Sequence, residues 1–276
     1  MTQDKGLMTA RFRYEVDLAH SVALLRPRGT LDALTAAELR SALLECLVEQ
    51  PVAVVLDTAE LILTDDIAVT VLGSVAREGL RWPGARFVLG GANQRLVAAI
   101  DRMGVGKYLT VFDNLTSALA ECGQWPVPPR LRRHIEPDRF APALARDAVE
   151  TFCGAYGVVG TDAAQLVASE LVTNAVLHAQ TGIDLTLRFI RPYLHVAVRD
   201  HGPGQARIAG HVDESQENGR GLLLVDALAS AWGNLFPING KIVWATVRVR
   251  SISVSGSHGH DPQVSGGDIG PDWPFG

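Results

Sequence analysis

Cysteine is scarce in this sequence, with only Cys46, Cys122 and Cys153 among 276 residues. The three are widely spaced and include no C-x-x-C pair, a pattern that indicates reduced thiols rather than disulfides or a zinc site. No apolar run reaches the roughly 18 residues of a membrane span, and the N-terminus lacks the apolar segment of a secretory signal. These absences lead us to expect a soluble protein of the cytoplasm.

An excess of positive charge is also missing. The 30 Asp and Glu residues outnumber 25 Lys and Arg residues, which gives a net charge of -5. Nucleic acid is therefore not expected as a direct partner, because binding its phosphates requires a basic surface. Apolar residues make up 47% of the chain, enough for ordinary buried cores, and the length suits two domains of about 100 to 150 residues each.

The first half of the chain alternates predicted strands and helices. A hairpin is predicted within residues 12–28, and the run VAVVLD after Pro51 is typical of a strand buried on both faces. In the leucine-rich stretch before it, Thr35 and Glu38 have the spacing of a capping box at a helix start. The alternation predicts an α/β domain over residues 11–122. Its other predicted elements are helices near 66–80, 93–103 and 115–122 and the strands RFVLGG and YLTVF.

The proline-rich stretch QWPVPPR separates the two halves, and we place a linker at residues 123–130. Helices followed by a mostly antiparallel sheet predict an α+β domain over residues 131–251. Residues 252–276 are rich in Ser, Gly, His, Asp and Pro, so a disordered tail is expected there. The second domain's predicted elements are helices near 142–156, 162–179 and 222–231 and the strands IDLTLRFI, LHVAVRD and IVWATVRVR.

Polar residues recur at four-residue intervals in the predicted helix 162–179. Glu170, Asn174 and His178 therefore share one face of that helix. An Asn oxygen is a suitable ligand for Mg²⁺, and a carboxylate beside it can take the proton of an attacking hydroxyl. A solvated polar stripe on an amphipathic helix would give the same spacing, so this helix alone does not decide between the two interpretations.

A carboxylate and two glycines follow the predicted strand LHVAVRD, in the segment Asp200-His201-Gly202-Pro203-Gly204. The carboxylate of Asp200 can accept a hydrogen bond from an exocyclic amine such as that of adenine. Gly202 and Gly204 would let a base approach the backbone closely. Taken alone, such a segment is more often an ordinary turn.

A third segment, Gly219-Arg220-Gly221, opens a predicted helix. The free backbone N–H groups and the positive dipole end of a helix start make it suitable for binding phosphate. In this order, ELVTNAVLHA, VRDHGPG and GRGLLLVDALASAWG resemble the N, G1 and G2 boxes of the GHKL (Bergerat-type) ATPase fold. The amino-acid sequences of these three segments most resemble those of the anti-sigma factor serine kinases of bacterial partner-switching systems.

This resemblance implies a two-layer α+β domain that binds ATP and Mg²⁺. It implies that Glu170 is the catalytic base, that Asn174 holds Mg²⁺, and that Asp200 recognises the adenine amine. Gly202 and Gly204 would shape the base pocket, and residues 205–218 would form a lid over the nucleotide.

The same resemblance implies that Gly219 and Gly221 bind the phosphates of ATP. Arg220 would either contact a phosphate or face solvent. His178 and His201 are interpreted as structural, because neither role requires an imidazole. The family's small-residue Gly-Thr pattern before the last strand is replaced here by Gly240-Lys241-Ile242, so a hydroxyl contact expected at that place is lost.

The first half resembles a STAS domain, the fold of anti-sigma factor antagonists, through GTLDALTAAELRSAL and VAVVLDTAELILTDDIAVTVL. The family's Asp-Ser-Ser/Thr-Gly segment, which carries a phosphorylatable serine, reads Asp65-Asp66-Ile67-Ala68 here. Asp66 places a permanent charge near the phosphoserine position, and Thr64 and Thr70 fall outside the acceptor register. We hypothesise a regulatory or docking module that is not phosphorylated. Alternatively, Asp66 is only a favourable residue at a helix N-terminus.

Together the resemblances imply an ATP-dependent serine/threonine protein kinase that acts on a separate STAS antagonist and binds a sigma factor, with a homodimer allowed. The alternative is a non-catalytic switch in which nucleotide occupancy changes partner affinity. The histidine-kinase branch of the fold is disfavoured, because no phosphoacceptor helix pair is evident in the sequence. Chaperone-type or topoisomerase-type ATPases are disfavoured by the lack of room for a transducer domain.

Overall fold

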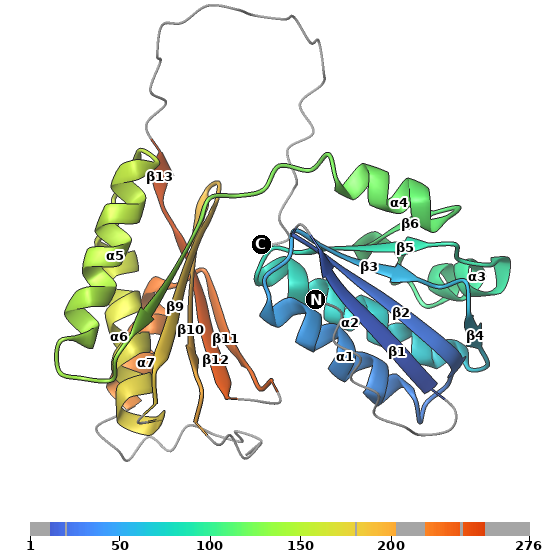
Figure 1. The fold of residues 1–276 in the computed structure, drawn as a ribbon, viewed down its shortest axis with the longest axis horizontal. Coiled ribbons are helices and arrows are strands. Elements are labelled where there is room, and N and C mark those ends of the chain that lie inside the picture. The colour runs from blue at the N-terminus through green and yellow to red at the C-terminus, as the bar shows by residue number, and fades with distance from the viewer. Residues whose placement is uncertain (1–11, 20, 180, 203–218, 238–239, 252–276) are drawn as a thin grey trace, which may run out of the picture.

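The computed structural model describes residues 12–19, 21–179, 181–202, 219–237 and 240–251. Gly204, the predicted lid and the predicted tail lie outside these residues. The described part forms a six-stranded and a five-stranded sheet, each with its own helices (Figure 1), and a third sheet of two short strands. None of its helices is both long and apolar enough to cross a membrane.

The N-terminal domain is an α/β fold with a sheet ordered β1-β2-β3-β5-β6, in which β4 also pairs with β2. The predicted hairpin is confirmed as the antiparallel pair β1 and β2, and the other pairings are parallel. Its elements are β1 Phe12–Ala19, β2 Val22–Leu31, α1 Ala36–Val48, β3 Ala53–Asp57, β4 Leu61–Leu63, the short 3₁₀ helices Asp66–Val69 and Gly106–Tyr108, α2 Thr70–Arg81, β5 Arg86–Gly90, α3 Gln94–Arg102, β6 Leu109–Phe112 and α4 Leu115–Cys122.

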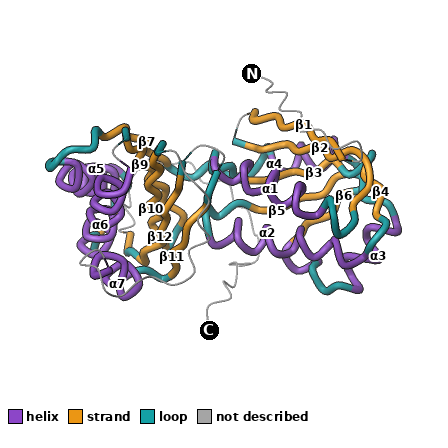
Figure 2. Tube along the Cα trace, turned by 90° about the horizontal axis from the view of Figure 1, so that it is seen from below, coloured by secondary structure: helices purple, strands orange, loops and turns teal. Residues whose placement is uncertain are grey.

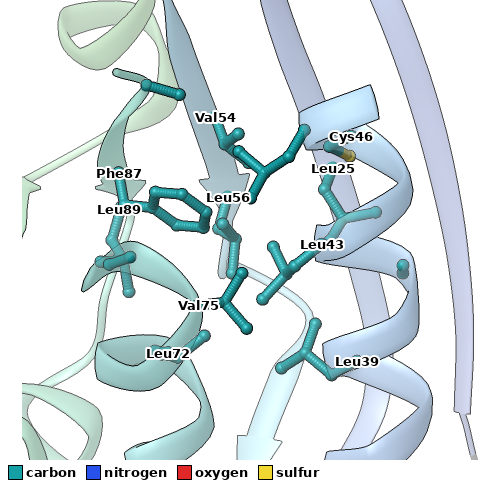
Figure 3. Close-up of a cluster of buried hydrophobic side chains, with 14 of the residues drawn as sticks. Leu25, Leu39, Leu43, Cys46, Val54, Leu56, Leu72, Val75, Phe87 and Leu89 are labelled. Atoms are coloured by element: carbon teal, nitrogen blue, oxygen red, sulfur yellow. The ribbon is translucent and has the colours of Figure 1, made fainter. Parts of the chain in front are cut away.

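Burial on both faces of β3 explains its unbroken apolar sequence. Successive side chains of a strand point to opposite faces of the sheet. Val54 and Leu56 belong to the core beneath α1 and α2, whereas Ala53 and Val55 belong to the core beneath α4. Figure 3 shows the first of these cores, in which side chains from the central strands interdigitate with those of α1 and α2.

The capping box predicted at the start of α1 is wrong. Thr35 has helical backbone angles and makes no side-chain bond to the helix. Its hydroxyl instead donates to the carbonyl of Thr30 at 2.8 Å and accepts from the N–H of Asp32 at 3.0 Å. The Asp32 carboxylate accepts hydrogen bonds from the N–H groups of Leu34 and Thr35. This Asx-turn sets the backbone conformation just before the helix begins.

The C-terminal domain is a two-layer α+β fold, as predicted. Its five-stranded sheet is ordered β11-β12-β10-β9-β7, with every neighbouring pair antiparallel, and α5, α6 and α7 cover one face (Figure 1). The predicted helix near 222–231 begins and ends three residues earlier, and β7 and β11 were not predicted. The elements are β7 Arg130–Ile135, α5 Ala141–Ala155, β8 Val158–Val159, α6 Asp162–Ala179, β9 Ile183–Ile190, β10 Tyr193–Asp200, α7 Gly219–Leu228, β11 Ala231–Leu235, β12 Lys241–Arg248 and β13 Arg250–Ser251.

The N-terminal domain covers the other face of this sheet. Ala197, Ile242 and Trp244 point away from α5, α6 and α7 and join the same buried cluster as the residues of α1 and α2. Trp82, just after α2, stacks on Trp244 with ring centroids 5.9 Å apart and planes 10° apart. Figures 1 and 2 show α1 and α2 facing this side of the sheet. The two domains therefore share a continuous apolar core.

Two arginines of the sheet bind the C-terminal end of α1. Arg188, only 3% exposed, donates to the carbonyls of Gln50 at 2.9 Å and Pro51 at 3.2 Å. Arg130 donates to the carbonyl of Glu49 at 3.0 Å. The carbonyl of Glu49 is at the C-cap of α1, where unpaired carbonyls carry partial negative charge that favours a cation such as Arg130. Burial, and to a lesser extent Arg130, lowers the pKa of Arg188 to about 10, so it stays charged at neutral pH.

Replacing Arg188 tests this contact. The substitution Arg188→Ala removes a buried cation and leaves two carbonyls without their donor, so it should lower the free energy of unfolding by about 2 to 4 kcal/mol. Urea denaturation followed by tryptophan fluorescence measures the loss. The matched control is Arg248→Ala at the exposed end of β12, which should change stability by less than about 0.5 kcal/mol. Equal effects of the two substitutions would contradict the interpretation.

His195 makes the stability of the protein depend on pH. It lies opposite Arg188 in the β9–β10 register, is 3% exposed, and neither ring nitrogen has a hydrogen-bond partner in the described chain. Burial first, and then the charge of Arg188, lowers the pKa of His195 to about 3 from the ordinary 6.5. Between these values the unfolded chain binds the extra proton, so stability falls as the pH drops below 6.5.

The expected loss from His195 is about 2 kcal/mol at pH 5 relative to pH 8, because 1.5 pH units separate pH 5 from the ordinary pKa and each unit is worth about 1.4 kcal/mol. Urea unfolding at both pH values, compared between the wild type and His195→Leu, isolates this residue, since the other histidines contribute equally to both proteins. Identical pH dependence of the two proteins would show that His195 is not buried in its neutral form.

Candidate functional site

The long helix α6 carries the first two candidate residues. Its buried side, which includes Val167 and Leu171, packs in the core between the helices and the sheet. Glu170 and Asn174 are both partly exposed, so a ligand can reach them. The side chain of His178, the third residue of the predicted stripe, lies outside the described residues.

The start of α7 packs directly against Glu170. A Cβ atom added to Gly221 would lie 2.6 Å from Oε2 of Glu170, closer than a real Cβ approaches an oxygen. Because α7 begins at Gly219, both glycines lie in its first turn, where backbone N–H groups have no partner within the helix. The structure thus brings the candidate catalytic carboxylate and the candidate phosphate-binding helix start together. The side chain of Arg220 is not among those described.

The end of β10 carries Asp200. By strand alternation with Val196 and Val198, which are buried under the helices, its side chain points to the helical face of the sheet. Its Oδ1 accepts a hydrogen bond from the N–H of Gly202 at 3.3 Å. Gly240 has φ +97°, and an added Cβ would collide with the carbonyl oxygen of Asp200. Only glycine fits there, which fixes the backbone around Asp200 from the side of β12.

Sequence reasoning missed Asp184, the most heavily bonded carboxylate near this site. Its side chain is 13% exposed and accepts hydrogen bonds from Arg132, His134 and His201, each at 2.9 Å. Burial alone raises the pKa of Asp184, but the bonds from His134, Arg132 and His201 outweigh it and hold the pKa well below the usual range. Asp184 falls inside an ordinary strand pattern, so no local sequence signal marks it.

Two family models match separate parts of the chain. Residues 13–118 match the family described as STAS domain, and residues 135–235 match the family described as Histidine kinase-like ATPase domain. The chain joins a STAS domain to a histidine kinase-like ATPase domain. No curated protein matches.

Several solved structures are similar to parts of this chain. An anti-sigma factor antagonist from Mycobacterium paratuberculosis is 21% identical over 41% of this chain and 95% of that one, with a TM-score of 0.35. A sulfate transporter family protein from Wolinella succinogenes is 24% identical over 39% and 88%, with a TM-score of 0.34. The Acinetobacter baumannii histidine kinase AdeS is 13% identical over 65% and 94%, with a TM-score of 0.27.

The acidic segment of the STAS domain is occupied by contacts within its own domain. Asp66 accepts two hydrogen bonds from Arg102, at 2.6 and 3.1 Å, and lies 3.8 Å from Arg95. Asp65, rather than Asp66, caps the 3₁₀ helix by accepting from the N–H of Ile67 at 2.9 Å. Asp66 therefore acts mainly as an ion-pair partner of the two arginines.

The two candidate regions lie on opposite sides of the molecule. Asp66 is bonded to the last residue of α3, and α3 and β4 form the end of the STAS domain farthest from the ATPase domain (Figures 1 and 2). Glu170 and Gly221 lie on α6 and α7, beyond the ATPase sheet. The acidic segment therefore does not face the candidate nucleotide site of its own chain.

The substitution Gly221→Ala tests the contact with Glu170. An alanine in the first turns of a helix should keep or raise stability, by up to about 1 kcal/mol, but its methyl group should displace the Glu170 carboxylate. We expect nucleotide-dependent activity to fall at least tenfold while the melting temperature holds or rises. Gly154→Ala on α5 is the control, because an added Cβ meets nothing within 4 Å there. Full activity of Gly221→Ala would show that the contact is unimportant.

Proposed function

We propose that this chain is an ATP-binding regulator of bacterial partner switching, whose ATPase domain phosphorylates serine or threonine on a separate STAS protein. The observation that carries the proposal is the packing of Gly221 against Glu170, by which the glycine-containing start of α7 lies beside a carboxylate. The match to a histidine kinase-like ATPase domain supports ATP as the nucleotide.

The proposed chemistry is phosphoryl transfer to a hydroxyl. The acceptor oxygen forms a bond to the γ-phosphorus, the bond from that phosphorus to ADP breaks, and Glu170 takes the hydroxyl proton. Asp200 accepts a hydrogen bond from the adenine amine, and the N–H groups of Gly219 and Gly221 bind phosphate oxygens. The amide oxygen of Asn174 would hold Mg²⁺, which would neutralise phosphate charge.

The proposed acceptor belongs to another molecule. Asp66 offers no hydroxyl, and the hydroxyls of Thr64 and Thr70 already donate to the carbonyls of Leu31 and Ile67. The segment also lies on the far side of the molecule from α6 (Figure 1). A separate STAS antagonist fits this requirement, and the similar solved structures include an anti-sigma factor antagonist. Binding of a sigma factor by the ATPase domain, in the cytoplasm, completes the proposal.

A non-catalytic switch is the second candidate. The observation that favours it is the STAS domain without an acceptor serine, because a chain that retains its own partner domain can regulate by docking alone. In this case nucleotide occupancy changes partner affinity and no phosphate is transferred. A homodimer in either case uses a surface other than the outer face of the ATPase sheet, which the STAS domain covers.

A transfer assay separates the two candidates. With ATP radiolabelled at the γ-phosphate and a panel of separate STAS proteins, the wild type should label a STAS partner. Glu170→Gln should reduce labelling by about 10²-fold or more while nucleotide binding persists, since loss of a general base affects the chemical step. Asn174→Ala should abolish Mg²⁺-dependent nucleotide binding. Glu150→Gln, on the exposed side of α5, is the matched control.

Three outcomes would count against parts of the proposal. Nucleotide binding without transfer to any STAS protein would favour the switch. Label on Thr64 or Thr70 of the chain itself, located by peptide mass analysis, would contradict an acceptor on another molecule. A wild type that binds no adenine nucleotide would overturn both candidates.

A further inference from the structure

We propose that Asp184 is a positioning residue for nucleotide recognition, holding the Asp200-His201-Gly202 segment in place from the opposite face of the ATPase sheet. The inference rests on the proposed function, because it assigns that segment to the adenine. It adds a residue that makes no contact with the nucleotide itself.

The register of the sheet brings Asp184 to this segment. Asp184 pairs with Arg199 across β9 and β10, and Asp200 pairs with Ile183, so both carboxylates lie at the same end of the two strands. Asp200 points to the helical face, whereas Asp184 alternates with the buried Ile183 and Leu185 and points to the outer face. The chain leaves β10 between these two carboxylates.

His201 is where the segment is anchored. Its Nε2 lies 2.9 Å from Oδ2 of Asp184, and its backbone N–H donates to the hydroxyl of Thr181 at 3.1 Å. The next residue, Gly202, donates its N–H to Asp200. The segment is thus tied to the start of β9, to the residues after α6 and to its own carboxylate, which limits the directions in which Asp200 can point.

Asp184 is itself held firmly enough to serve as an anchor. Arg132 binds Oδ2, His134 binds Oδ1, and the side chain is 13% exposed, so its rotation would break charge-assisted hydrogen bonds. The depressed pKa keeps Asp184 ionised through the neutral range. Both histidines have the geometry to donate to an ionised carboxylate.

Asp184 also lines a cavity at the junction of the two domains. Arg132 and Asp184 line a cavity of about 20 Å³ together with Glu49 and Gln50 at the end of α1. The docked STAS domain therefore restricts the surroundings of Asp184 on the outer face.

The test is the preference of the protein for adenine over guanine. In Asp184→Asn, calorimetric titrations with ADP and GDP should show about tenfold weaker ADP binding and a reduced ADP:GDP affinity ratio. A purely structural loss would lower the folded fraction and weaken both nucleotides equally, leaving the ratio unchanged. Asp184→Glu, which restores the charge, should recover part of the ratio.

Matched variants make the outcome decisive. Asp147→Asn makes the same chemical change at an exposed carboxylate of this domain, which pairs with Arg133, and should leave the ratio unchanged. His201→Ala removes only the bond from His201 to Asp184, and the His201 side chain is 39% exposed. This variant should show the same loss of adenine preference, and it replaces Asp184→Asn in the test if that variant does not fold.

The proposed function and this inference fail in different ways. A wild type that binds no ADP overturns the function itself. If Asp200→Asn loses the adenine preference while Asp184→Asn and His201→Ala keep it, the site stands and the positioning role of Asp184 is overturned.

Discussion

Burial of the outer face of the ATPase sheet determines the architecture of the whole chain. An antiparallel sheet covered by helices on one side can leave its other side to water, but here that side carries Trp244 and Ile242. Stacking of Trp82 on Trp244 and packing of α1 and α2 against the strands remove this apolar surface from solvent. The buried guanidinium of Arg188 is compatible with this apolar contact because Gln50 and Pro51, which follow α1, supply two carbonyls.

The domain junction also separates the two chemically distinctive regions. The face of the ATPase sheet that contacts the STAS domain is opposite to the face beneath α6 and α7, so neither Glu170 nor Gly221 is covered by the fused domain (Figure 1). The acidic segment at Asp66 remains at the far end, accessible to another protein. Both regions are therefore accessible at the same time, and the fused STAS domain does not cover the candidate nucleotide site of its own chain.

Periodicity and composition predicted most of this fold, and the failures have physical causes. The apolar run of β3 and the helices α4 and α6 follow from local patterns. β7 was missed because RLRRHI has three arginines, two of which reach the domain junction only after distant segments come together. The capping box failed because the strand end and Asp32 bind the Thr35 hydroxyl. Asp184 depends on partners from two other segments, β7 and the residues after β10, which no local pattern contains.

The surroundings of Asp66 refine the idea that it imitates a phosphoserine. A phosphate carries a charge of about -1.5 to -2 and three acceptor oxygens, whereas a carboxylate carries one charge and two oxygens. The two positive charges of Arg102 and Arg95 are at least enough to neutralise the single negative charge of the Asp66 carboxylate. Arg95 also donates a hydrogen bond to the carbonyl of Leu63. Little uncompensated negative charge is then left to attract a partner. The ion pairs with Arg102 and Arg95 therefore weaken the electrostatic part of the hypothesis that Asp66 imitates a phosphoserine.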